Sequence, residues 1–517
     1  MINESTLKPF GQVRPANESQ FRQYAGKLFI IFCLLHLVVW TIAQAYIYQN
    51  PPTDSVESVA WGNLWLWGYE KHPPLAAWLS ASFSTIFGVV GWPIYFLSQL
   101  SIVICFSAIW RLGKQILTPE HALLGVVFLE GVNYYNLQAA SFNPNVLMLP
   151  LWALVILHFY QALRYNQWRD WILLGIFSGL AMLAKYESAL LLLILLAFLL
   201  TDKHYRFRLK QLQPYLTVMI AFILFLPNLI WLSLHNFDAV RYAVGEMSVQ
   251  GSSFWLRLKH YVWQPTNFLL EQLGCILPGF LFFIPFIKGH QTELKISGWQ
   301  LRFLFWTAVM PLLSTLILAI LVHAHLVSRW GFPFFSVFGL FWIAMFKPYV
   351  TRTRIKWMFV IVITYMFMAI AGQFYLYNVR PYYTHVSNYA ASFPGKTIAA
   401  TVTKTWHEKF KTKLPYAAGD HQVVVNVSAF SVDKPVPFFN WSERQSPWVN
   451  QADMQKRGAV FVLLMSRPGA VQMREHIEKR YPHLIDKHIV AFQRYTKAQV
   501  AKVKIWIAFL APKTDTN

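Results

Sequence analysis

Long apolar segments alternate with short polar loops over the first three quarters of the chain. Nine of these segments have about the 20 residues that a helix needs to cross a bilayer, and they lie near 28–46, 93–112, 121–140, 146–163, 214–234, 267–287, 303–322, 330–346 and 357–377. A further region, 171–201, is interrupted at Lys185-Tyr186-Glu187 and is typical of a hairpin of two shorter helices. The pattern therefore predicts a mostly α-helical, polytopic membrane protein with about eleven spans.

Residues 378–517 have a different pattern. Short β-like runs at 397–402, 423–427, 459–464 and 505–510 accompany one helical stretch near 469–480. Such mixing predicts a small α/β fold. We therefore expect two domains, a transmembrane catalytic domain over 1–377 and a soluble α/β domain over 378–517.

The basic residues of the short loops set the expected orientation, because lysine and arginine accumulate on the cytoplasmic side of membrane proteins. With the N-terminus inside, nineteen of them fall in inner loops and six in outer loops. An odd number of spans then leaves the C-terminal domain outside the cytoplasm. We expect a multi-pass protein of the bacterial inner membrane with a periplasmic domain, whose first apolar helix stays as an anchor.

Composition agrees with a membrane protein, since hydrophobic residues make up 56% of the 517 positions and charged residues only 13%. The formal net charge of +22 would suit nucleic acid. The basic residues, however, lie in loops and in the C-terminal part without an aromatic RNA-binding signature, so we expect membrane lipids as partners and no nucleic acid. The cysteines, Cys33, Cys105 and Cys275, lie inside apolar stretches and form no disulfide framework or metal cluster.

The loop after the first apolar segment carries two acids, Asp54 and Glu57, three residues apart. A helix beginning here would place both carboxylates on one face, with Asp54 as its N-cap. A partly desolvated Asp54 can take a proton from an attacking oxygen, while Glu57 orients it or holds a cation. A divalent metal on Asp54 and Glu57 stays open because two carboxylates are a sparse ligand set. The alternative is an interfacial loop with solvated charges.

Cations gather on the same side of the predicted membrane. Lys71 and His72 precede two prolines, whose rigid turn would hold them at the membrane face. Lys185 lies in the hairpin turn and Arg329 on an outer loop. Lys71, Lys185 and Arg329 together match a bound phosphate. The alternatives are a snorkelling anchor for Lys71 and an ion pair between Lys185 and Glu187.

Other polar residues are candidates of different strength. Glu130 lies inside an apolar span, where an ionisable side chain is costly and faces a cavity or a partner. Asn143 and Asn145 lie on the next outer loop and can face the first loop, although asparagines there are commonly turn formers. We interpret one further polar cluster, on a long outer loop, as a solvated face without chemistry: His235, Asp238, Arg241 and Glu246.

Several sequence motifs of nucleotide and zinc enzymes do not occur. The chain has no GxxxxGK[ST] loop, no GxGxxG after a strand and no HExxH, which weighs against a nucleotide-driven pump or a zinc protease. A transporter or flippase of lipid-linked glycans is the main alternative to an enzyme, and an accessory envelope-binding protein is a third. A transporter places charges near the bilayer midplane between repeats, whereas here they gather at the outer interface, which favours the enzyme.

Four short motifs together resemble those of the bacterial GT-C glycosyltransferases, and are similar to those of protein O-mannosyltransferases and lipid A aminoarabinose transferases. They are Asp54-x-x-Glu57, Gly68-Tyr69-x-Lys71-His72-Pro73-Pro74-Leu75, Asn143-Pro144-Asn145 and Gly179-Leu180-x-x-Leu183-Ala184-Lys185-Tyr186. They cover roughly the first 200 residues. The multi-span layout and the outer C-terminal domain extend the resemblance beyond them.

The resemblance implies an inverting sugar transfer, with or without a metal, from a polyprenyl-phosphate donor to an envelope acceptor such as lipid A, a glycan or a protein. It makes Asp54 the catalytic base, Glu57 its acidic neighbour, Lys71 the phosphate-facing lysine and Lys185 the lysine of the hairpin. We expect the substrates to contact also His72, Tyr186, Asn143, Asn145, Arg329 and Glu130. The family's second loop usually ends in Pro-Asp where this chain has Pro144-Asn145, so the sugar and the metal stay open, and no cofactor is assigned.

Overall fold

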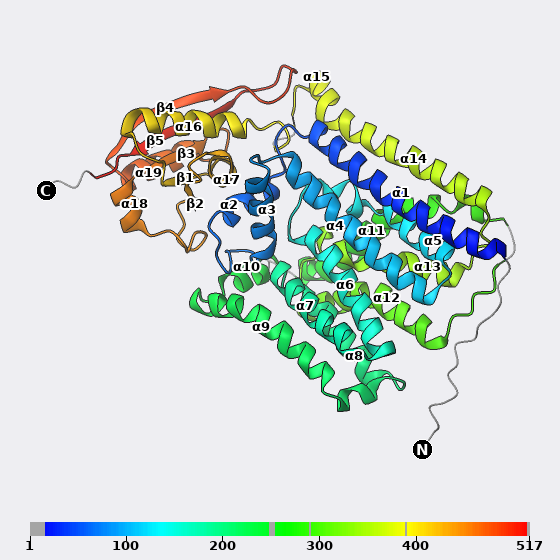
Figure 1. The fold of residues 1–517 in the computed structure, drawn as a ribbon. Coiled ribbons are helices and arrows are strands. Elements are labelled where there is room, and N and C mark those ends of the chain that lie inside the picture. The colour runs from blue at the N-terminus through cyan, green and yellow to red at the C-terminus, as the bar shows by residue number, and fades with distance from the viewer. Residues whose placement is uncertain (1–15, 248–253, 289–290, 388–389, 514–517) are drawn as a thin grey trace.

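A large body of helices and a smaller body built on a sheet make up the protein (Figure 1). The computed structural model describes residues 16–247, 254–288, 291–387 and 390–513. The helices of the large body are α1 (Ala16–Ile47), α2 (Thr53–Gly62), α3 (Leu75–Ile86), α4 (Trp92–Ile116), α5 (Pro119–Glu130), α6 (Pro144–Tyr165), α7 (Trp168–Ala184), α8 (Ser188–Thr201), α9 (Gln213–Leu234), α10 (Asp238–Met247), α11 (Phe254–Leu281), α12 (Gly298–Val322), α13 (Phe338–Phe346) and α14 (Arg352–Phe374). The protein is therefore mostly α-helical, as predicted.

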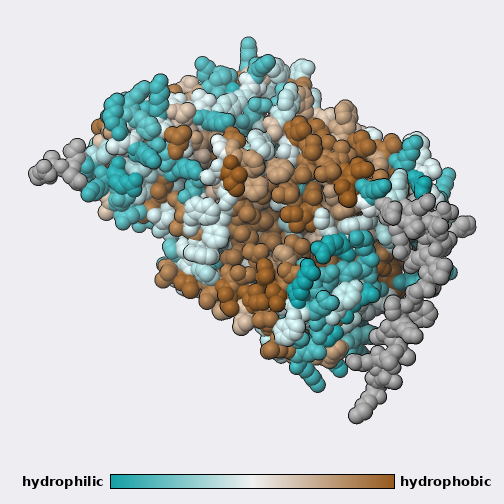
Figure 2. All heavy atoms as spheres, in the orientation of Figure 1, coloured by the Kyte–Doolittle hydropathy of each residue, from teal (hydrophilic) through white to brown (hydrophobic). Residues whose placement is uncertain are grey.

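Within the described ranges, six helices are long and apolar enough to cross a membrane. They are α4, α6, α9, α12, the part of α1 from Tyr24 and the segment Arg352–Thr384. A bent pair, the 3₁₀ helix η6 (Ser328–Phe335) followed by α13, would make a seventh. Figure 2 shows a broad hydrophobic band over the helical body, bounded by the hydrophilic sheet body on one side and a second hydrophilic region opposite. This distribution is typical of a protein whose hydrophobic band lies in a membrane and whose two hydrophilic regions lie in water on either side.

The helix boundaries differ from three of the predicted spans. The segment 121–140 is not one helix: α5 ends at Glu130, and two short 3₁₀ turns follow, η2 (Asn133–Tyr135) and η3 (Gln138–Ala140). The chain turns there because Gly131 packs directly on Gly279, and because the Asn136 amide donates to the Glu130 carbonyl. The span at 330–346 is broken by a bend of 56° between η6 and α13. The span at 267–287 is α11, which begins at Phe254 and ends at Leu281 before a short 3₁₀ helix, η5 (Ile284–Phe286). The hairpin at 171–201 is confirmed as α7 and α8.

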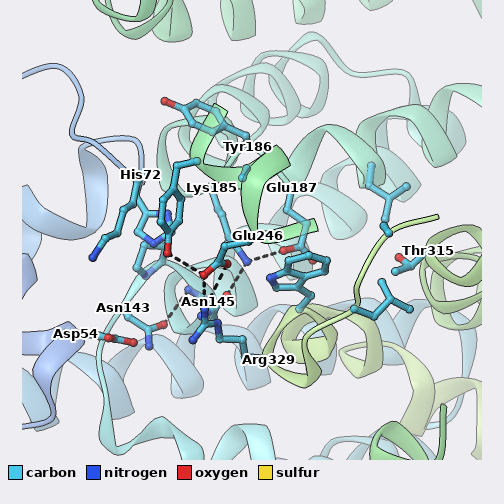
Figure 3. Close-up of a pocket in the computed structure, with 18 of the residues that line it drawn as sticks. Asp54, His72, Asn143, Asn145, Lys185, Tyr186, Glu187, Glu246, Thr315 and Arg329 are labelled. Atoms are coloured by element: carbon cyan, nitrogen blue, oxygen red, sulfur yellow. Dashed lines mark hydrogen bonds and ion pairs between the residues drawn. The ribbon is translucent and has the colours of Figure 1, made fainter. Parts of the chain in front are cut away.

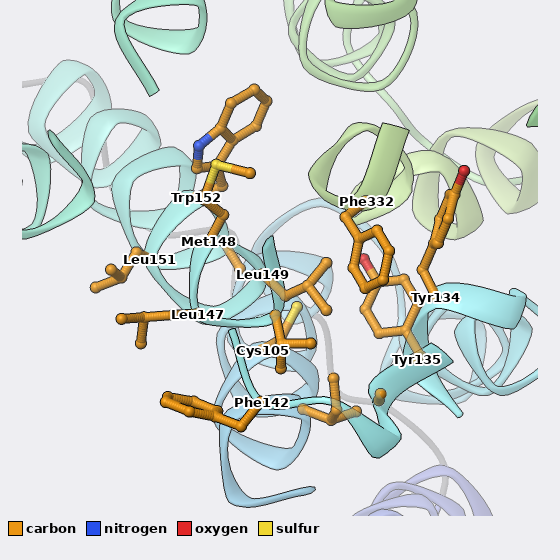
Figure 4. Packing of buried hydrophobic residues seen from close by; sticks show 14 of the residues in the cluster. Cys105, Tyr134, Tyr135, Phe142, Leu147, Met148, Leu149, Leu151, Trp152 and Phe332 are labelled. Carbon is orange, nitrogen blue, oxygen red and sulfur yellow. The ribbon is translucent and has the colours of Figure 1, made fainter. Parts of the chain in front are cut away.

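The core of the helical body packs around α6 (Figure 4). Met148 and Trp152 of α6 are fully buried, as are Cys105 of α4 and Tyr135 of η2. Proline is favoured in the first turn of a helix, where its missing N–H costs nothing, and α6 begins at Pro144. Because α6 is buried along most of its length, its packing fixes the position of its first turn, which contains Asn145.

The smaller body contains a mixed five-stranded sheet in the order β2-β1-β3-β5-β4. Its strands are β1 (Tyr416–Gly419), β2 (Val436–Phe439), β3 (Ala459–Leu464), β4 (Leu484–Phe492) and β5 (Val503–Leu510). β1 is parallel to β2 and β3, whereas β5 is antiparallel to β3 and β4. A π-helical segment (Tyr375–Val379) and α15 (Arg380–Thr384) continue α14 of the helical body. The helices of the smaller body are α16 (Gly395–Phe410), α17 (His421–Phe430), α18 (Gln451–Arg457) and α19 (Ala470–Arg480).

The predicted α/β pattern of this body is right in part. The strands at 459–464 and 505–510 and the helix near 469–480 are confirmed as β3, β5 and α19. The predicted strands at 397–402 and 423–427 are wrong, because both runs lie inside helices, α16 and α17. Val423, Val424, Val425 and Val427 are all fully buried. Packing on both sides of α17 therefore outweighs the strand preference of its valines.

The two bodies meet at α2, which lies against α17 (Figure 1). The Thr53 hydroxyl at the start of α2 donates to the side-chain oxygen of Gln422 on α17, at 2.9 Å. On its other side α2 packs on α3, where Gly62 lies so close to the Ala77 carbonyl that any side chain would collide with it. α2 is thus held between the sheet body and the helical body.

Candidate active site

A cavity of about 600 Å³ brings together all of the predicted site residues except Glu130 (Figure 3). Its polar lining comes from loops and helix ends: Asp54, Glu57, Ser58, Lys71, His72, Asn143, Asn145, Lys185, Tyr186, Glu187, Tyr242, Glu246 and Arg329. Its apolar lining comes mainly from α8 and α12: Leu190, Leu193, Leu318, Ala319 and Val322, with Leu326 and Trp330. In Figure 3, Thr315 of α12 lies on the opposite side of the cavity from Asp54.

The short helix α2 carries the two acids. Pro51 and Pro52 precede it, and Pro52 is its N-cap. Asp54 therefore stands within the first turn, so its predicted assignment as the cap is wrong. The prediction that the two carboxylates share one face of the helix is right, because Asp54 and Glu57 both line the cavity. A carboxylate in the first turn is favoured by the free N–H groups at the start of a helix.

Glu57 is held by two partners. Its Oε1 accepts from the Lys71 ammonium at 2.8 Å and pairs with Nε2 of His421 at 2.5 Å. Burial would raise the pKa of Glu57, but Lys71 and His421 outweigh it and lower the pKa to about 2. Glu57 is thus ionised at neutral pH. No hydrogen bond joins it to Asp54 in the described structure, and the cation that it holds is Lys71.

Asp54 is the free carboxylate of the site. It has no hydrogen bond or ion pair with any described residue, and its side chain faces the cavity. Asp54 is exposed by its accessible surface, which opens onto the cavity, but the protein that surrounds the cavity still desolvates the carboxylate and raises its pKa. The negative charge of Glu57 also raises this pKa, whereas Arg329 and Lys71 lower it. A raised pKa makes a carboxylate a stronger base. The arrangement therefore separates the acids into one that is paired and one that is available for proton transfer.

Lys185 joins the turn between α7 and α8 to the start of α6. Its ammonium donates to Oδ1 of Asn145 at 2.7 Å and to Oε2 of Glu187 at 2.6 Å. Asn143 caps α6, accepting from the backbone N–H of Asn145 at 2.9 Å and of Val146 at 3.3 Å. The structural interpretations of Asn143 as a turn former and of Lys185 as an ion-paired residue thus hold, while both residues also line the cavity.

His72 supplies a neutral imidazole. Burial lowers its pKa most, and the positive charge of Lys185 has the next largest effect, so that the pKa is about 3. The turn that presents it is closed by a backbone hydrogen bond from the Tyr69 N–H to the His72 carbonyl, at 3.1 Å. At neutral pH His72 is therefore a hydrogen-bonding group and not a cation. Tyr186, the other predicted residue of the hairpin turn, also lines the cavity.

Arg329 meets residues to which the sequence assigned no chemistry. Its guanidinium lies 3.3 Å from Oε1 of Glu246, and the same oxygen accepts from the Tyr242 hydroxyl at 2.8 Å. Glu246 lines the cavity, so its interpretation as part of a solvated face is wrong. The sequence could not place Glu246 at the cavity, because a loop that faces water and a loop that faces a cavity have the same polar composition.

Three comparisons with known proteins bear on this arrangement. A family model described as dolichyl-phosphate-mannose-protein mannosyltransferase matches residues 71–231. The lipopolysaccharide core galacturonosyltransferase RgtA of Rhizobium johnstonii is 21% identical over 212 residues, which are 40% of this chain and 41% of RgtA. The chain therefore matches less than half the length of this relative. The crystal structure of ArnT from Cupriavidus metallidurans bound to undecaprenyl phosphate has a TM-score of 0.57 and 13% sequence identity, over 94% of this chain and 99% of ArnT.

This chain has the fold of ArnT. The resemblance inferred from the sequence motifs is thus confirmed, and the likeness to ArnT extends over the C-terminal sheet body as well as the helices.

One predicted site residue, Glu130, lies elsewhere. Glu130 is fully buried. Its Oε2 lies 2.6 Å from Nδ1 of His36, and its Oε1 accepts from the Trp40 indole at 2.8 Å. It does not line the cavity, so the expectation that Glu130 contacts the substrate is wrong. Hydrogen bonds from His36 and Trp40 offset the free-energy cost of burying this acid, so Glu130 has a structural role.

The residues that line the larger cavity do not fit a metal well. Within the described ranges, no three side chains of histidine, cysteine, aspartate or glutamate gather as a metal-binding group. Glu57 is already paired with Lys71 and His421, and the position of the family's second-loop aspartate holds Asn145. We therefore derive no step through a metal.

A second cavity, of about 370 Å³, lies on another side of Asp54. Asp54, Asn143, Asn145 and Arg329 line both cavities. The second is lined further by neutral polar and aromatic side chains, among them Tyr48, Gln138, Ser141 and Tyr377. Asp54 thus lies where the two cavities meet.

Proposed function

We propose that this protein is a membrane glycosyltransferase that moves a sugar from a polyprenyl-phosphate donor to an envelope acceptor, either lipid A, a glycan or a protein, at the outer face of the inner membrane. The observation that carries the proposal is the composition of the larger cavity. An apolar lining from α8 and α12 continues into a polar lining that holds Lys71, Lys185 and Arg329. A lipid chain fits the first part and a phosphate the second.

The relatives support this choice of ligand. ArnT of Cupriavidus metallidurans binds undecaprenyl phosphate in a crystal structure of the same fold, and RgtA is named for sugar transfer to a lipopolysaccharide core. Both descriptions agree with a lipid-linked donor and a glycolipid acceptor for this chain.

The mechanism that we propose is a single displacement at Asp54. An acceptor hydroxyl enters from the smaller cavity and attacks the sugar C1, the bond between C1 and the phosphate oxygen breaks, and the hydroxyl proton passes to Asp54. The leaving polyprenyl phosphate accepts hydrogen bonds from the remaining N–H donors of Lys71, Lys185 and Arg329, which also pair with Glu57, Glu187 and Glu246. A single displacement inverts the configuration at C1. Because its pKa is raised, Asp54 is suited to accept the proton.

The proposed topology has about eleven crossings: the six long apolar helices, the helix α11, the short helices α5, α7 and α8, and the bent pair of η6 and α13. Residues 1–377 then form the transmembrane catalytic domain, and 378–517 form a periplasmic domain. Two features support this orientation: the basic residues concentrate in the alternate loops, and the sheet body lies beside α2, which carries Asp54.

A flippase is the alternative function, and it receives less support. The charged residues lie on helix ends and loops around a free acid at the junction of two cavities. A carrier needs no such base, whereas a transferase does.

Mass spectrometry of lipid A and envelope glycans tests the proposal. Cells with the gene should contain a species heavier by one sugar residue, which disappears on deletion and returns with the wild-type gene but not with Asp54→Asn at equal protein level. In vitro, the purified protein should bind undecaprenyl phosphate much more tightly than undecaprenol. Unchanged glycan profiles together with no preference for the phosphate would contradict the proposal.

A further inference from the structure

The start of α17 reaches the candidate active site from the sheet body. β1 lies between two parallel neighbours, β2 and β3, and the carboxyl end of such a strand is where α/β sheets commonly hold ligands. The chain leaves β1 at Gly419, and Asp420 caps α17 by accepting from the Gln422 N–H at 3.1 Å. His421 and Gln422 follow, and both contact α2 of the helical body.

The His421 ring is fixed by aromatic neighbours. Its centroid lies 4.8 Å from that of Phe439, at the end of β2, and Phe439 contacts Trp448 edge-on at 6.0 Å. Trp448 in turn lies 6.1 Å from Tyr69, which precedes Lys71 by two residues. Tyr69 stacks on Trp61 of α2 at 5.2 Å. The same set of rings therefore orients His421 and the turn that presents Lys71.

His421 and Lys71 share one oxygen of Glu57. Because Glu57 is ionised, it can only accept hydrogen bonds, so Nε2 of His421 must carry the proton that it donates. Lys71 donates to the same Oε1. Glu57 is 6% exposed, and a buried carboxylate that loses one donor either turns toward the remaining one or draws in water. Either change alters how much of the Lys71 charge is available to a ligand in the cavity.

We infer that His421 is a positioning residue for the donor phosphate: from the sheet body, it holds Glu57 so that Lys71 stays directed into the cavity. The inference rests on the proposed function, since it takes a polyprenyl phosphate as the ligand. His421 does not line the larger cavity itself, so its effect on the ligand passes through Glu57 and Lys71. The sheet body thereby contributes to binding inside the helical body.

The test is the binding of undecaprenyl phosphate to the purified full-length protein, with undecaprenol as the comparison ligand. His421→Ala should weaken phosphate binding about tenfold, the scale of one charge-assisted hydrogen bond, and leave undecaprenol binding unchanged. His421→Gln, which keeps a donor at similar reach, should recover most of the loss. Wild-type affinity in His421→Ala would overturn the inference.

Gln422→Ala is the matched control. It removes the neighbouring contact between the same two helices, the bond from Thr53 at 2.9 Å, without touching Glu57. A role of His421 in docking alone predicts equal losses in His421→Ala and Gln422→Ala, and that result would overturn the inference. The positioning role predicts a loss only in the first.

A double-variant cycle tests the path through Glu57. Once Glu57→Gln has removed the carboxylate, adding His421→Ala should weaken binding no further, because residues that act through one another are not additive. Additive losses would overturn the inference. His407→Ala is the control for folding defects. It breaks a similar pair in the sheet body, between His407 and Asp433 at 2.6 Å, away from the larger cavity. The melting temperature of His407→Ala shows how much the loss of such a pair destabilises the protein. If His421→Ala does not fold, His421→Asn replaces it, with the same expected loss.

Binding of the wild-type protein and of His421→Ala distinguishes a wrong function from a wrong role of His421. If the wild-type protein does not prefer undecaprenyl phosphate to undecaprenol, the proposed function is wrong. If it does, and His421→Ala shows the same preference at the same affinity, only the role of His421 is wrong.

Discussion

Lys185 donates to the amide oxygen of Asn145 at 2.7 Å, which ties the turn after α7 to the first turn of α6. Its other partner is the Glu187 carboxylate at 2.6 Å. Because position 145 is an amide here, Lys185 has one carboxylate partner and not two. The local charge of this group is therefore neutral, where the family's usual aspartate would make it negative.

Asn145→Asp should weaken binding of a polyprenyl phosphate by about tenfold, because the added negative charge lies beside the cavity that receives the phosphate. The measurement is the dissociation constant of undecaprenyl phosphate at fixed ionic strength. Asn166→Asp is the matched control, since it adds the same charge at the other end of α6. Equal effects of the two substitutions would show that the charge acts only at long range.

Asp54→Asn should lower turnover by about 10² to 10⁴, the usual contribution of a general base. Donor affinity should not fall, because Asp54→Asn keeps the size of the side chain and removes a negative charge from the cavity that receives the phosphate. Single-turnover sugar transfer and donor binding, measured on the same preparation, separate the two effects. Asp238→Asn, at the start of α10 and outside the cavity lining, is the control. Full turnover in Asp54→Asn would remove Asp54 from the chemistry.

The acid limb of the pH–rate profile should report Asp54. Its pKa lies above the ordinary aspartate value, and only its ionised form accepts a proton, so kcat/KM should fall as the pH drops through that raised pKa. Arg329 lowers the pKa of Asp54; its removal raises the pKa further. Arg329→Gln should therefore move the acid limb to higher pH, whereas Arg241→Gln, at an exposed position outside the cavity, should not. A limb that moves to lower pH would contradict this assignment.

Lys71→Ala and Lys185→Ala should each weaken use of the donor by about 1.5–3 kcal/mol, since each removes a partly buried cation from the cavity. Donor concentration series on samples of equal protein content give the effect. Lys434→Ala is the control, because Lys434 lies on the sheet body and contacts only the Thr85 hydroxyl among the hydrogen bonds of the described residues. Wild-type kinetics in both cavity variants would return these lysines to the role of membrane anchors.

The topology can be tested with fusions. A reporter that works only after export should be active when fused after residue 378, and one that works only in the cytoplasm should be active when fused near Arg206. The physical reason is the excess of basic residues in the loops assigned to the inside. The reverse result would place Asp54 on the cytoplasmic side and contradict the proposed reaction.

Local signals in the sequence were enough for much of the site. The spacing of Asp54 and Glu57 and the proline turn after Lys71 are features of neighbouring residues, and the structure places all three side chains at one cavity. Asn145 and Lys185 come from separate segments, and the family resemblance brought them together before the fold did. Their catalytic and binding roles remain predictions.

What the sequence did not predict depends on contacts between distant segments. His421 is 364 residues from Glu57, and a single histidine at the start of a helix carries no local signal. The valines of α17 were assigned to a strand because propensity was considered without the packing that buries them. Glu130 was assigned to the substrate because its partners, His36 and Trp40, come from α1. Hydropathy along the chain shows that an acid is costly in such a segment, but not which neighbour compensates for it.

The order of the chain has a consequence for assembly. α2 is made early and α17 late, after every helix of the large body. Until α17 has been synthesised and has folded onto β1, Glu57 faces Lys71 without the second donor that His421 provides. A nascent chain that has already inserted its helices is therefore still incomplete at its own cavity until the sheet body, which is synthesised last, adds His421.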